Sequence, residues 1–157
     1  MSFVIYDVET TGLNKRFDQI LQFAAVHADA DLVVTDRFDV RIRLMPHIVP
    51  SPTALHVNSL DISDVLNPES PSHYDAVCSI ARALQSWSPS VFLGYNSIRF
   101  DEEFLRQALY MCLHPPFLTN TNGNTRGDIL NLVRAAAVLV PGALQIPQEE
   151  GRACFRL

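Results

Sequence analysis

The sequence has 157 residues, of which 48% are hydrophobic and 18% are charged, so it suits a single globular domain and excludes a disordered chain. Its formal net charge of -5 argues against a uniformly basic nucleic-acid binder, but it leaves room for an enzyme whose acids bind metal and whose few arginines bind phosphate. Three cysteines without a Cys-x-x-Cys spacing, no basic leader and no long apolar run predict a cytoplasmic protein with reduced thiols and no membrane contact.

The first predicted element is a buried strand that ends in two acids. Residues 3–6 are apolar and strand-forming. Side chains alternate between the faces of a strand, so Asp7 and Glu9 point the same way with Cα atoms roughly 7 Å apart. Two carboxylates on one face repel each other unless they share a divalent cation, and oxygen ligands suit Mg²⁺ or Mn²⁺. The alternative is a strand end that runs into solvent. Residues 10–12 then predict a tight turn.

Two further strands follow the turn. Residues 20–28 predict a second strand, and residues 29–31 predict a hairpin turn. In residues 37–44 apolar side chains alternate with charged ones, which predicts a third strand with one buried face and one face in solvent. We interpret the arginines of this strand as part of the solvated face. The first three strands therefore predict an antiparallel meander.

The next stretch predicts little regular structure. Residues 45–54 contain three prolines and predict an extended crossing loop. Residues 56–66 predict a short helix. We interpret His56 as a surface or core histidine in preference to a metal ligand or a base.

A helix, a strand and a second helix come next. Ser72-x-x-Asp75 has the spacing of a capping box, and apolar residues at helical spacing predict a helix that runs to about Trp87. Residues 91–95 predict a short buried strand, which the crossover through a helix would place parallel to the first strand. A second helix is predicted from about Arg99 to Leu113, and its core stripe is made by Phe100, Phe104, Ala108 and Met111.

Asp101 lies in the first turn of that second helix. The helix dipole favours an acid there, so Asp101 can be an ordinary member of an acidic trio with the two glutamates that follow it. Asp101 also follows a strand predicted to lie beside the first one, and in an open α/β sheet that edge binds ligands. We therefore expect Asp7, Glu9 and Asp101 to converge. Arg106 can pair with one of the two glutamates one turn back.

A loop and a third helix complete the predicted elements. Residues 119–127 are polar and rich in turn residues, which predicts a loop, and residues 128–140 carry apolar side chains at helical spacing. Arg126 precedes this helix and Arg134 lies on it. Residues 143–157 show no clear period. The predicted fold class is α/β, with a mixed sheet of an antiparallel meander plus parallel strands, flanked by helices on both faces.

Two motifs of this sequence resemble the first two motifs of the DEDD-type 3′–5′ exonucleases, which have a ribonuclease-H-like fold. They are Asp7-x-Glu9-Thr10-x-Gly12 and Asn96-x-x-x-Phe100-Asp101. Two segments are similar more narrowly to the bacterial exodeoxyribonuclease I family, namely Gly94-Tyr95-Asn96-x-x-Arg99-Phe100-Asp101 and Asn124-x-Arg126-x-Asp128. The resemblance runs from Phe3 to the terminal Phe155-Arg156-Leu157.

This resemblance implies a two-metal site. Asp7 would bridge two divalent ions, Mg²⁺ or Mn²⁺, while Glu9 would bind one of them and Asp101 would bind the second directly or through water. One ion would activate the attacking water and the other would stabilise the leaving 3′ oxygen. The resemblance also implies a set of substrate contacts, in which Leu13 lies against the terminal base: Thr10, Gly12, Leu13, Asn96, Phe100, Arg106, Phe117, Arg126, Arg134 and Arg156.

The sequence departs from the family at the third motif. That motif carries a general-base histidine and a fourth aspartate spaced His-x-x-x-x-Asp, and no histidine follows His114 here. Residues 1–157 are therefore expected to form an exonuclease domain truncated before that motif, with weak metal binding and little or no activity.

The predicted function is 3′–5′ hydrolysis of single-stranded DNA with release of nucleotides, in the context of DNA repair. Single-stranded DNA is the predicted partner, and single-stranded DNA-binding protein is a predicted partner of the complete enzyme. Three alternatives stay open. The chain can be a non-catalytic nucleic-acid-binding or metal-binding fragment of this fold, an RNA-directed exonuclease with the same acids, or an unrelated α/β domain with fortuitous acids.

Overall fold

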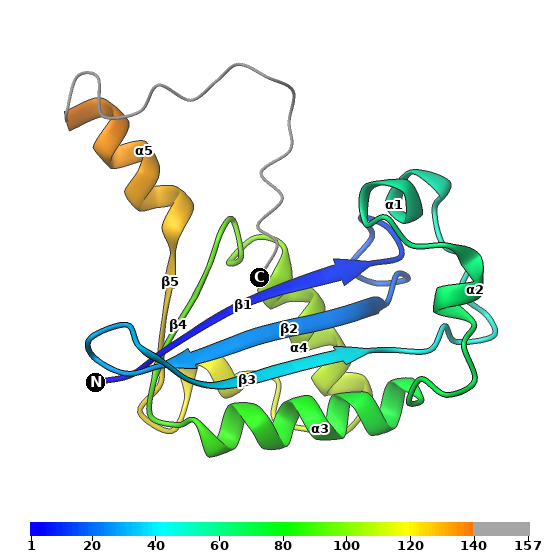
Figure 1. Cartoon of the computed structure of the whole chain (residues 1–157), viewed down its shortest axis with the longest axis horizontal. Coiled ribbons are helices and arrows are strands. Elements are labelled where there is room, and N and C mark those ends of the chain that lie inside the picture. The colour runs from blue at the N-terminus through cyan, green and yellow to red at the C-terminus, as the bar shows by residue number, and fades with distance from the viewer. Residues whose placement is uncertain (140–157) are drawn as a thin grey trace.

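The computed structural model describes residues 1–139 and shows a five-stranded mixed sheet with strand order β3-β2-β1-β4-β5 (Figure 1). The meander consists of β1 (Phe3–Thr10), β2 (Ile20–Ala28) and β3 (Val34–Arg41), each antiparallel to its neighbour. The strand β4 (Val91–Gly94) pairs parallel to β1, and β5 (Thr125–Asp128) pairs parallel to β4. The predicted mixed sheet is therefore confirmed, including the place of β4 beside β1.

The strand β5 corrects the loop predicted for residues 119–127. Its four residues, Thr-Arg-Gly-Asp, contain no apolar alternation, so their pattern does not predict a strand. The pairing of β5 depends on the backbone and on a close approach, because Gly127 lies opposite Leu93 and a Cβ at this glycine would come within 2.9 Å of Leu93 Cδ2. The same stretch also contains a short 3₁₀ turn, η1 (Leu118–Asn120).

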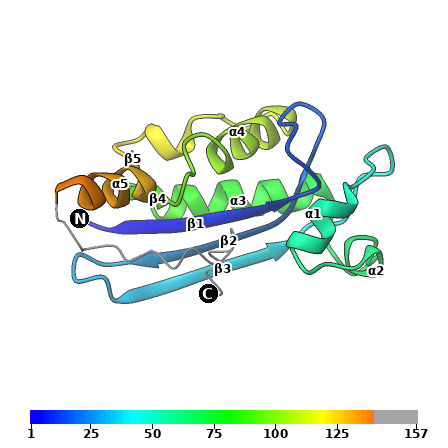
Figure 2. The same cartoon turned by 90° about the horizontal axis from the view of Figure 1, so that it is seen from above.

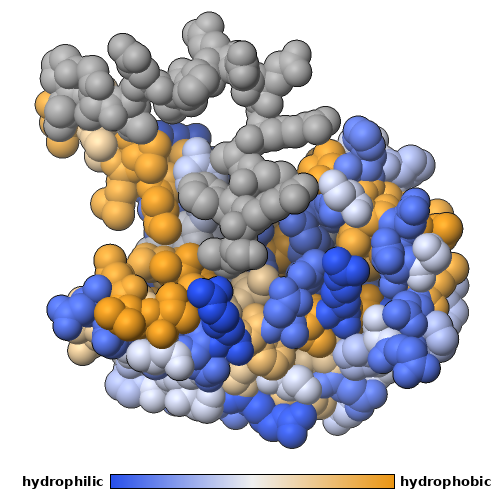
Figure 3. Space-filling view, viewed as in Figure 1, coloured by the Kyte–Doolittle hydropathy of each residue, from blue (hydrophilic) through white to orange (hydrophobic). Residues whose placement is uncertain are grey.

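Two helices, α3 (His73–Ser86) and α4 (Asp101–Met111), cover one face of the sheet (Figure 2). The core lies between them and the sheet, and its fully buried aromatic side chains are those of Phe23, Phe92 and Phe104. The expectation of helices packed on both faces is wrong for the described residues, because α5 (Ile129–Leu139) buries none of its side chains. Exposed apolar residues give α5 a hydrophobic surface (Figure 3), among them Leu132, Val138 and Leu139.

The helix boundaries follow the local sequence signals. The Ser72 hydroxyl accepts a hydrogen bond from the Asp75 backbone N–H (3.2 Å), which confirms the predicted N-cap of α3. Met111 is 52% exposed, so its place in the predicted core stripe of α4 is wrong. The side chains of Leu105 and Leu109 fill the core there instead. None of the helices in residues 1–139 has the length and hydrophobicity needed to cross a membrane.

Two short helices, α1 (Pro52–Val57) and α2 (Ile62–Val65), follow β3. The helix α2 confirms the short helix predicted within residues 56–66, whereas α1 replaces the end of the predicted crossing loop. A proline at the first position of a helix costs no hydrogen bond, so a proline-rich stretch can still begin a helix. Two hydrogen bonds hold α1 over the turn after β1: Ser51 N donates to Thr11 O (2.7 Å) and Asn58 Nδ2 donates to Thr10 O (3.1 Å).

Candidate active site

Asp7 and Asp101 come together where β1 passes the end of β4. The strand β4 pairs with β1 only through residues 3–5, so the edge of β1 beyond that point is open. Asp101, the first residue of α4, occupies this edge, and its Oδ1 accepts a hydrogen bond from the Val8 backbone N–H (3.1 Å). Only 3% of Asp101 is exposed. An otherwise unpaired strand N–H thus fixes a buried carboxyl beside Asp7.

The acids of this site disfavour one another's charged forms. Burial raises the pKa of Asp101 to about 7, and the negative charge of Asp7 adds to this rise. Desolvation also raises the pKa of Asp7. The pKa of Glu9 is raised by desolvation and then by the charge of Asp7, which lies two residues before it on the same face of β1. A positive charge placed among these groups would favour their ionised forms.

The donor set fits a hard divalent cation, because all of its donor atoms are carboxylate oxygens. Asp7 and Asp101 adjoin, and Glu9 lies at the end of β1. Within residues 1–139, no three His, Cys, Asp or Glu side chains are already gathered closely enough to hold a metal ion. The predicted convergence is therefore seen for the two aspartates, and Glu9 would have to turn toward them to join a shared ion.

A cleft of about 640 Å³ lies next to Glu9 and has a mostly apolar lining. Its walls come from the end of β1, from the turn that follows it, from α1 and from Phe100. The expected contacts Thr10, Gly12 and Leu13 line it, and Leu13 is 82% exposed at its edge. The wall made by α1 was not predicted from the sequence, because the prolines of residues 45–54 favour a loop. That wall consists of Ser51, Thr53, Ala54, Val57 and Asn58.

Hydrogen bonds within the turn after β1, and from this turn to Asp18, hold the turn in place. The Thr10 hydroxyl donates to Gly12 O (2.7 Å), and the Thr11 hydroxyl donates to Asp18 Oδ1 (2.9 Å). A Cβ on Gly12 would lie 2.5 Å from Asp18 Oδ2, so this position requires glycine for close packing. Thr10 and Gly12 therefore shape one wall of the cleft.

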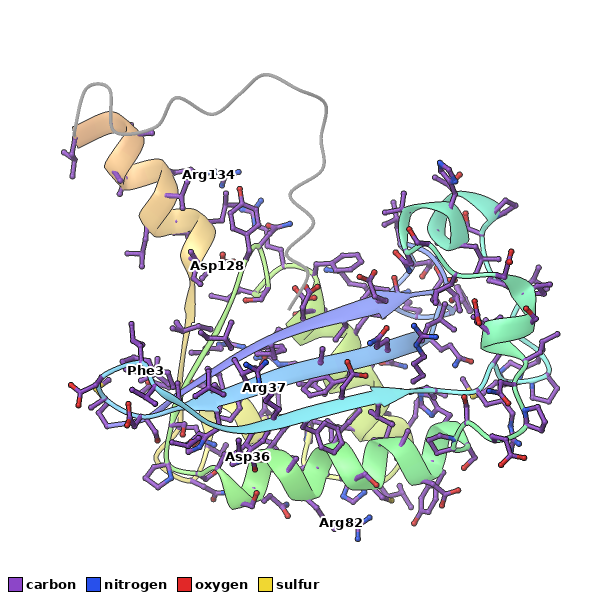
Figure 4. All side chains as sticks on the ribbon, viewed as in Figure 1. Phe3, Asp36, Arg37, Arg82, Asp128 and Arg134 are labelled. Carbon is purple, nitrogen blue, oxygen red and sulfur yellow. The ribbon has the colours of Figure 1, made fainter. Side chains whose placement is uncertain are left out.

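The loop between β4 and α4 is held by Asp128 at the end of β5. Asn96 has a positive φ of 59°, and its backbone N–H donates to Asp128 Oδ1 (2.9 Å), while Ile98 N donates to Asp128 Oδ2 (3.3 Å). The Phe100 ring packs on Phe104, with centroids 5.0 Å apart, and lines the cleft. Figure 4 shows Asp128 where β5 meets α5. Asp128 thus positions the segment that leads to the acids.

The arginines expected to bind substrate occupy different surroundings. Arg106 and Arg126 both form ion pairs with Glu102 Oε1 at 3.0 Å, so the alternative pairing considered for Arg106 is confirmed. The Arg106 guanidinium also lies over the Phe117 ring, 4.8 Å from its centroid. Arg134 is exposed on α5 (Figure 4).

Arg156 and His56 are the last two residues singled out in the sequence. Arg156 lies outside the described residues. His56 is exposed in the last turn of α1, as its interpretation as a surface residue predicts.

The mixed sheet and the paired acids define a ribonuclease-H-like α/β domain. The exonuclease family model (RNase_T) matches residues 4–143, so the chain belongs to this exonuclease family. The chain is 31% identical to exodeoxyribonuclease I of Haemophilus influenzae over 99% of its own length. That match covers 33% of the relative, so the chain spans about a third of its length.

Solved structures of related enzymes have the same fold. The zinc-bound form of the Escherichia coli ExoI–single-stranded DNA complex is 25% identical, with a TM-score of 0.85 over 94% of this chain and 32% of that one. The ExoI/SSB-Ct complex is 24% identical, with a TM-score of 0.85 over 95% of this chain and 32% of that one. These solved structures include complexes with single-stranded DNA and with an SSB C-terminal segment, and one of them contains zinc.

Proposed function

We propose that this chain forms the metal-binding and strand-binding part of a 3′–5′ exonuclease that acts on single-stranded DNA. One observation carries the proposal: the buried Asp101 carboxyl is fixed by the Val8 N–H beside Asp7, and the adjacent residues Glu9 and Phe100 line an apolar cleft. A pair of acids held together in this way costs folding free energy, because burial and repulsion oppose their ionisation. A cation and a nucleic-acid terminus are the ligands that suit such a place.

The three acids would hold Mg²⁺ or Mn²⁺, and two ions are proposed for the complete enzyme. Bound ions of this kind supply activation of a water molecule and stabilisation of a leaving 3′ oxygen. Asp7 would be the shared ligand, because its charge acts both on Glu9, on its own strand, and on Asp101, on α4. The hydrogen bond from the Val8 N–H would hold Asp101 in position for such an ion.

The cleft beside Glu9 would receive the terminal nucleotide. Its lining is mostly apolar, so a base can stack or pack there without being read by hydrogen bonds. Leu13 at the edge and Phe100 at the wall are the proposed contacts with this base. Thr10 and Gly12 form the other wall, where the Thr10 hydroxyl donates to Gly12 O and Gly12 packs against Asp18.

The rest of the strand would run along the cationic and aromatic side chains. Phe117 is 49% exposed and carries Arg106 against its ring, which suits stacking of a base next to a phosphate contact. The proposed phosphate contacts are Arg106, Arg126, Arg134 and Arg156. These contacts carry no sequence preference, as expected of an enzyme that degrades any single strand.

The family's general-base histidine has no counterpart in this sequence, since no histidine follows His114. A base of this kind typically contributes about 10²–10⁴-fold to the rate. We therefore propose that the 157-residue chain binds single-stranded DNA and cleaves it slowly. The SSB-Ct segment is proposed as a partner of the complete protein only.

Digestion of 5′-labelled single-stranded DNA tests this function. With the chain in excess over DNA and with Mg²⁺ or Mn²⁺ present, the products should shorten slowly from the 3′ end, and Asp7→Asn should abolish the shortening. Parallel digestions of matched double-stranded DNA and of RNA with the same sequence identify the substrate class. Shortening from the 5′ end, activity that persists in Asp7→Asn, or a preference for RNA would contradict the proposal. Rapid cleavage that is lost in Asp7→Asn would support the function and refute the expected need for a missing base.

A further inference from the structure

Glu102 lies at the centre of a buried polar cluster in residues 1–139. Its side chain is 1% exposed. Its Oε1 accepts hydrogen bonds from Arg106 Nε (3.0 Å), Arg126 Nη1 (3.0 Å) and the Thr119 hydroxyl (2.6 Å). Its Oε2 accepts a hydrogen bond from the Tyr6 hydroxyl (2.9 Å). One buried carboxylate thus joins β1, α4, η1 and β5.

The tyrosine in this cluster acts as a donor. Burial raises the pKa of Tyr6 well above its usual range, and the charge of Glu102 raises it further, so the hydroxyl keeps its proton. All four groups around Glu102 therefore donate to it. No buried polar side-chain atom in residues 1–139 lacks a hydrogen-bond partner, so the Glu102 carboxylate is fully hydrogen-bonded, and its four donors hold it in this orientation.

The two arginines differ from the rest of the cluster because they reach the surface. Their side chains are 21% exposed for Arg106 and 28% exposed for Arg126. Arg106 also lies on the ring of Phe117, which is half exposed. One carboxylate between two guanidinium groups leaves the trio with a net positive charge. Glu103 offsets part of that charge, because its carboxylate lies 3.5 Å from an Arg106 nitrogen, and the Arg106 guanidinium lies over the Phe117 ring.

A buried ion pair is weak evidence for stability, because apolar residues of the same volume can stabilise a fold equally well. What a carboxylate adds is orientation, since it holds the planar guanidinium groups through directed hydrogen bonds. Ordering two long side chains before a ligand arrives removes an entropic cost from binding. The arrangement at Glu102 has the features expected of such preorganisation.

We infer that Glu102 is a positioning residue for the nucleic-acid strand: it aligns Arg106 and Arg126 beside Phe117 as one platform for a phosphate and a base. This inference rests on the proposed function, because it assigns a strand-binding role to the surface next to the acids. Glu102 itself is too deeply buried to touch the strand. Its effect on binding is exerted through the two arginines.

Substitution by glutamine separates positioning from simple electrostatics. Glu102→Gln keeps the shape of the side chain and removes one negative charge, and Glu103→Gln removes the same charge from the next residue, which is 44% exposed and only 3.5 Å from an Arg106 nitrogen. Electrostatics alone predicts that both variants bind DNA more tightly, because both make the chain less negative. Positioning predicts opposite signs, with Glu102→Gln weaker and Glu103→Gln equal or tighter.

The measurement is fluorescence anisotropy of a short 5′-fluorescein-labelled oligothymidylate, titrated with the 157-residue chain in EDTA to prevent cleavage. We expect Glu102→Gln to weaken binding by roughly tenfold, on the scale of one lost charge-assisted contact. We also expect a shallower salt dependence, by about 0.7 in the log–log slope for each arginine that loses its phosphate. Circular dichroism melts identify a temperature at which every variant is folded.

A double-mutant comparison excludes a purely structural effect. In an Arg106→Ala, Arg126→Ala background, Glu102→Gln should no longer weaken binding, because the groups that it positions are gone. Equal or tighter binding by folded Glu102→Gln, or the same loss in both backgrounds, would overturn the inference while leaving the proposed function standing. If the wild-type chain itself failed to bind the oligonucleotide, the proposed function and the inference would both fall.

Discussion

The raised pKa of Asp101 makes a quantitative prediction about stability. Its pKa is about 7 in the folded chain, against an ordinary value of 3.8. Between these values the folded state keeps a proton that the unfolded state has released, so stability falls as the pH rises from about 4 to about 7. Each pKa unit corresponds to about 1.4 kcal/mol. The shift therefore predicts a loss on the order of 4 kcal/mol by pH 8 without metal.

Asp101→Asn tests this cost directly. Asparagine keeps an Oδ1 that can accept the Val8 N–H, but it carries no charge at any pH. At pH 4.5 the variant should match the wild type closely, whereas at pH 8 it should be more stable by most of that amount. Asp7→Asn should change stability in the same direction, because it removes the neighbouring charge that helps to raise the Asp101 pKa.

Urea unfolding in EDTA, followed by the fluorescence of the single tryptophan, Trp87, provides the assay. Trp87 is 7% exposed, so its emission should report loss of the core. Added Mg²⁺ at pH 8 should stabilise the wild type and leave Asp101→Asn unchanged, because a ligand stabilises only the state that binds it. A difference between variant and wild type that is the same at both pH values would refute the reasoning.

Three further predictions concern the turn, the platform and the metal. Gly12→Ala should lower the free energy of unfolding by about 1–3 kcal/mol in urea titrations, because the new Cβ would collide with the Asp18 carboxylate 2.5 Å away. Phe117→Ala should weaken oligonucleotide binding by about 1–3 kcal/mol, measured by anisotropy, whereas Tyr110→Ala on the exposed side of α4 should not. Calorimetric titration with Mg²⁺ should show at most one bound ion, and Asp7→Asn should remove it; two tightly bound ions would contradict the expected weakness of the site.

The parts of the site that could be predicted from the sequence lie in or next to segments with a clear hydrophobic pattern. Alternation along β1 placed Asp7 and Glu9 on one face, and the short apolar run at β4 placed Asp101 beside that strand. The α1 wall of the cleft could not be predicted in this way, because a run of prolines favours a loop unless one of them opens a helix. The strand β5 lacked any signal, since it pairs through its backbone and through the closeness of Gly127 to Leu93.

Glu102 shows a second reason why sequence patterns fall short. In the sequence it is the middle member of an acidic trio at a helix start, and nothing local distinguishes it from Glu103. In the structure Glu102 is buried and Glu103 is half exposed. The groups that make its burial tolerable are Tyr6, Thr119 and Arg126, which are 96, 17 and 24 residues away along the chain. Their convergence depends on how four elements pack together. A periodic pattern in the sequence of any one element does not predict that packing.

The contrast between the adjacent acids Asp101 and Glu102 explains how one helix start can serve two purposes. Both side chains are almost fully buried, yet only Glu102 is given positive partners, in the form of two arginines. Asp101 accepts the Val8 backbone N–H and faces the negative charge of Asp7. A fold that stabilised both acids equally would leave a cation little to gain at either. Because Glu102 has two positive partners while Asp101 and Asp7 repel each other, the proposed divalent ion would gain most at Asp101 and Asp7, next to the surface where the strand is proposed to lie.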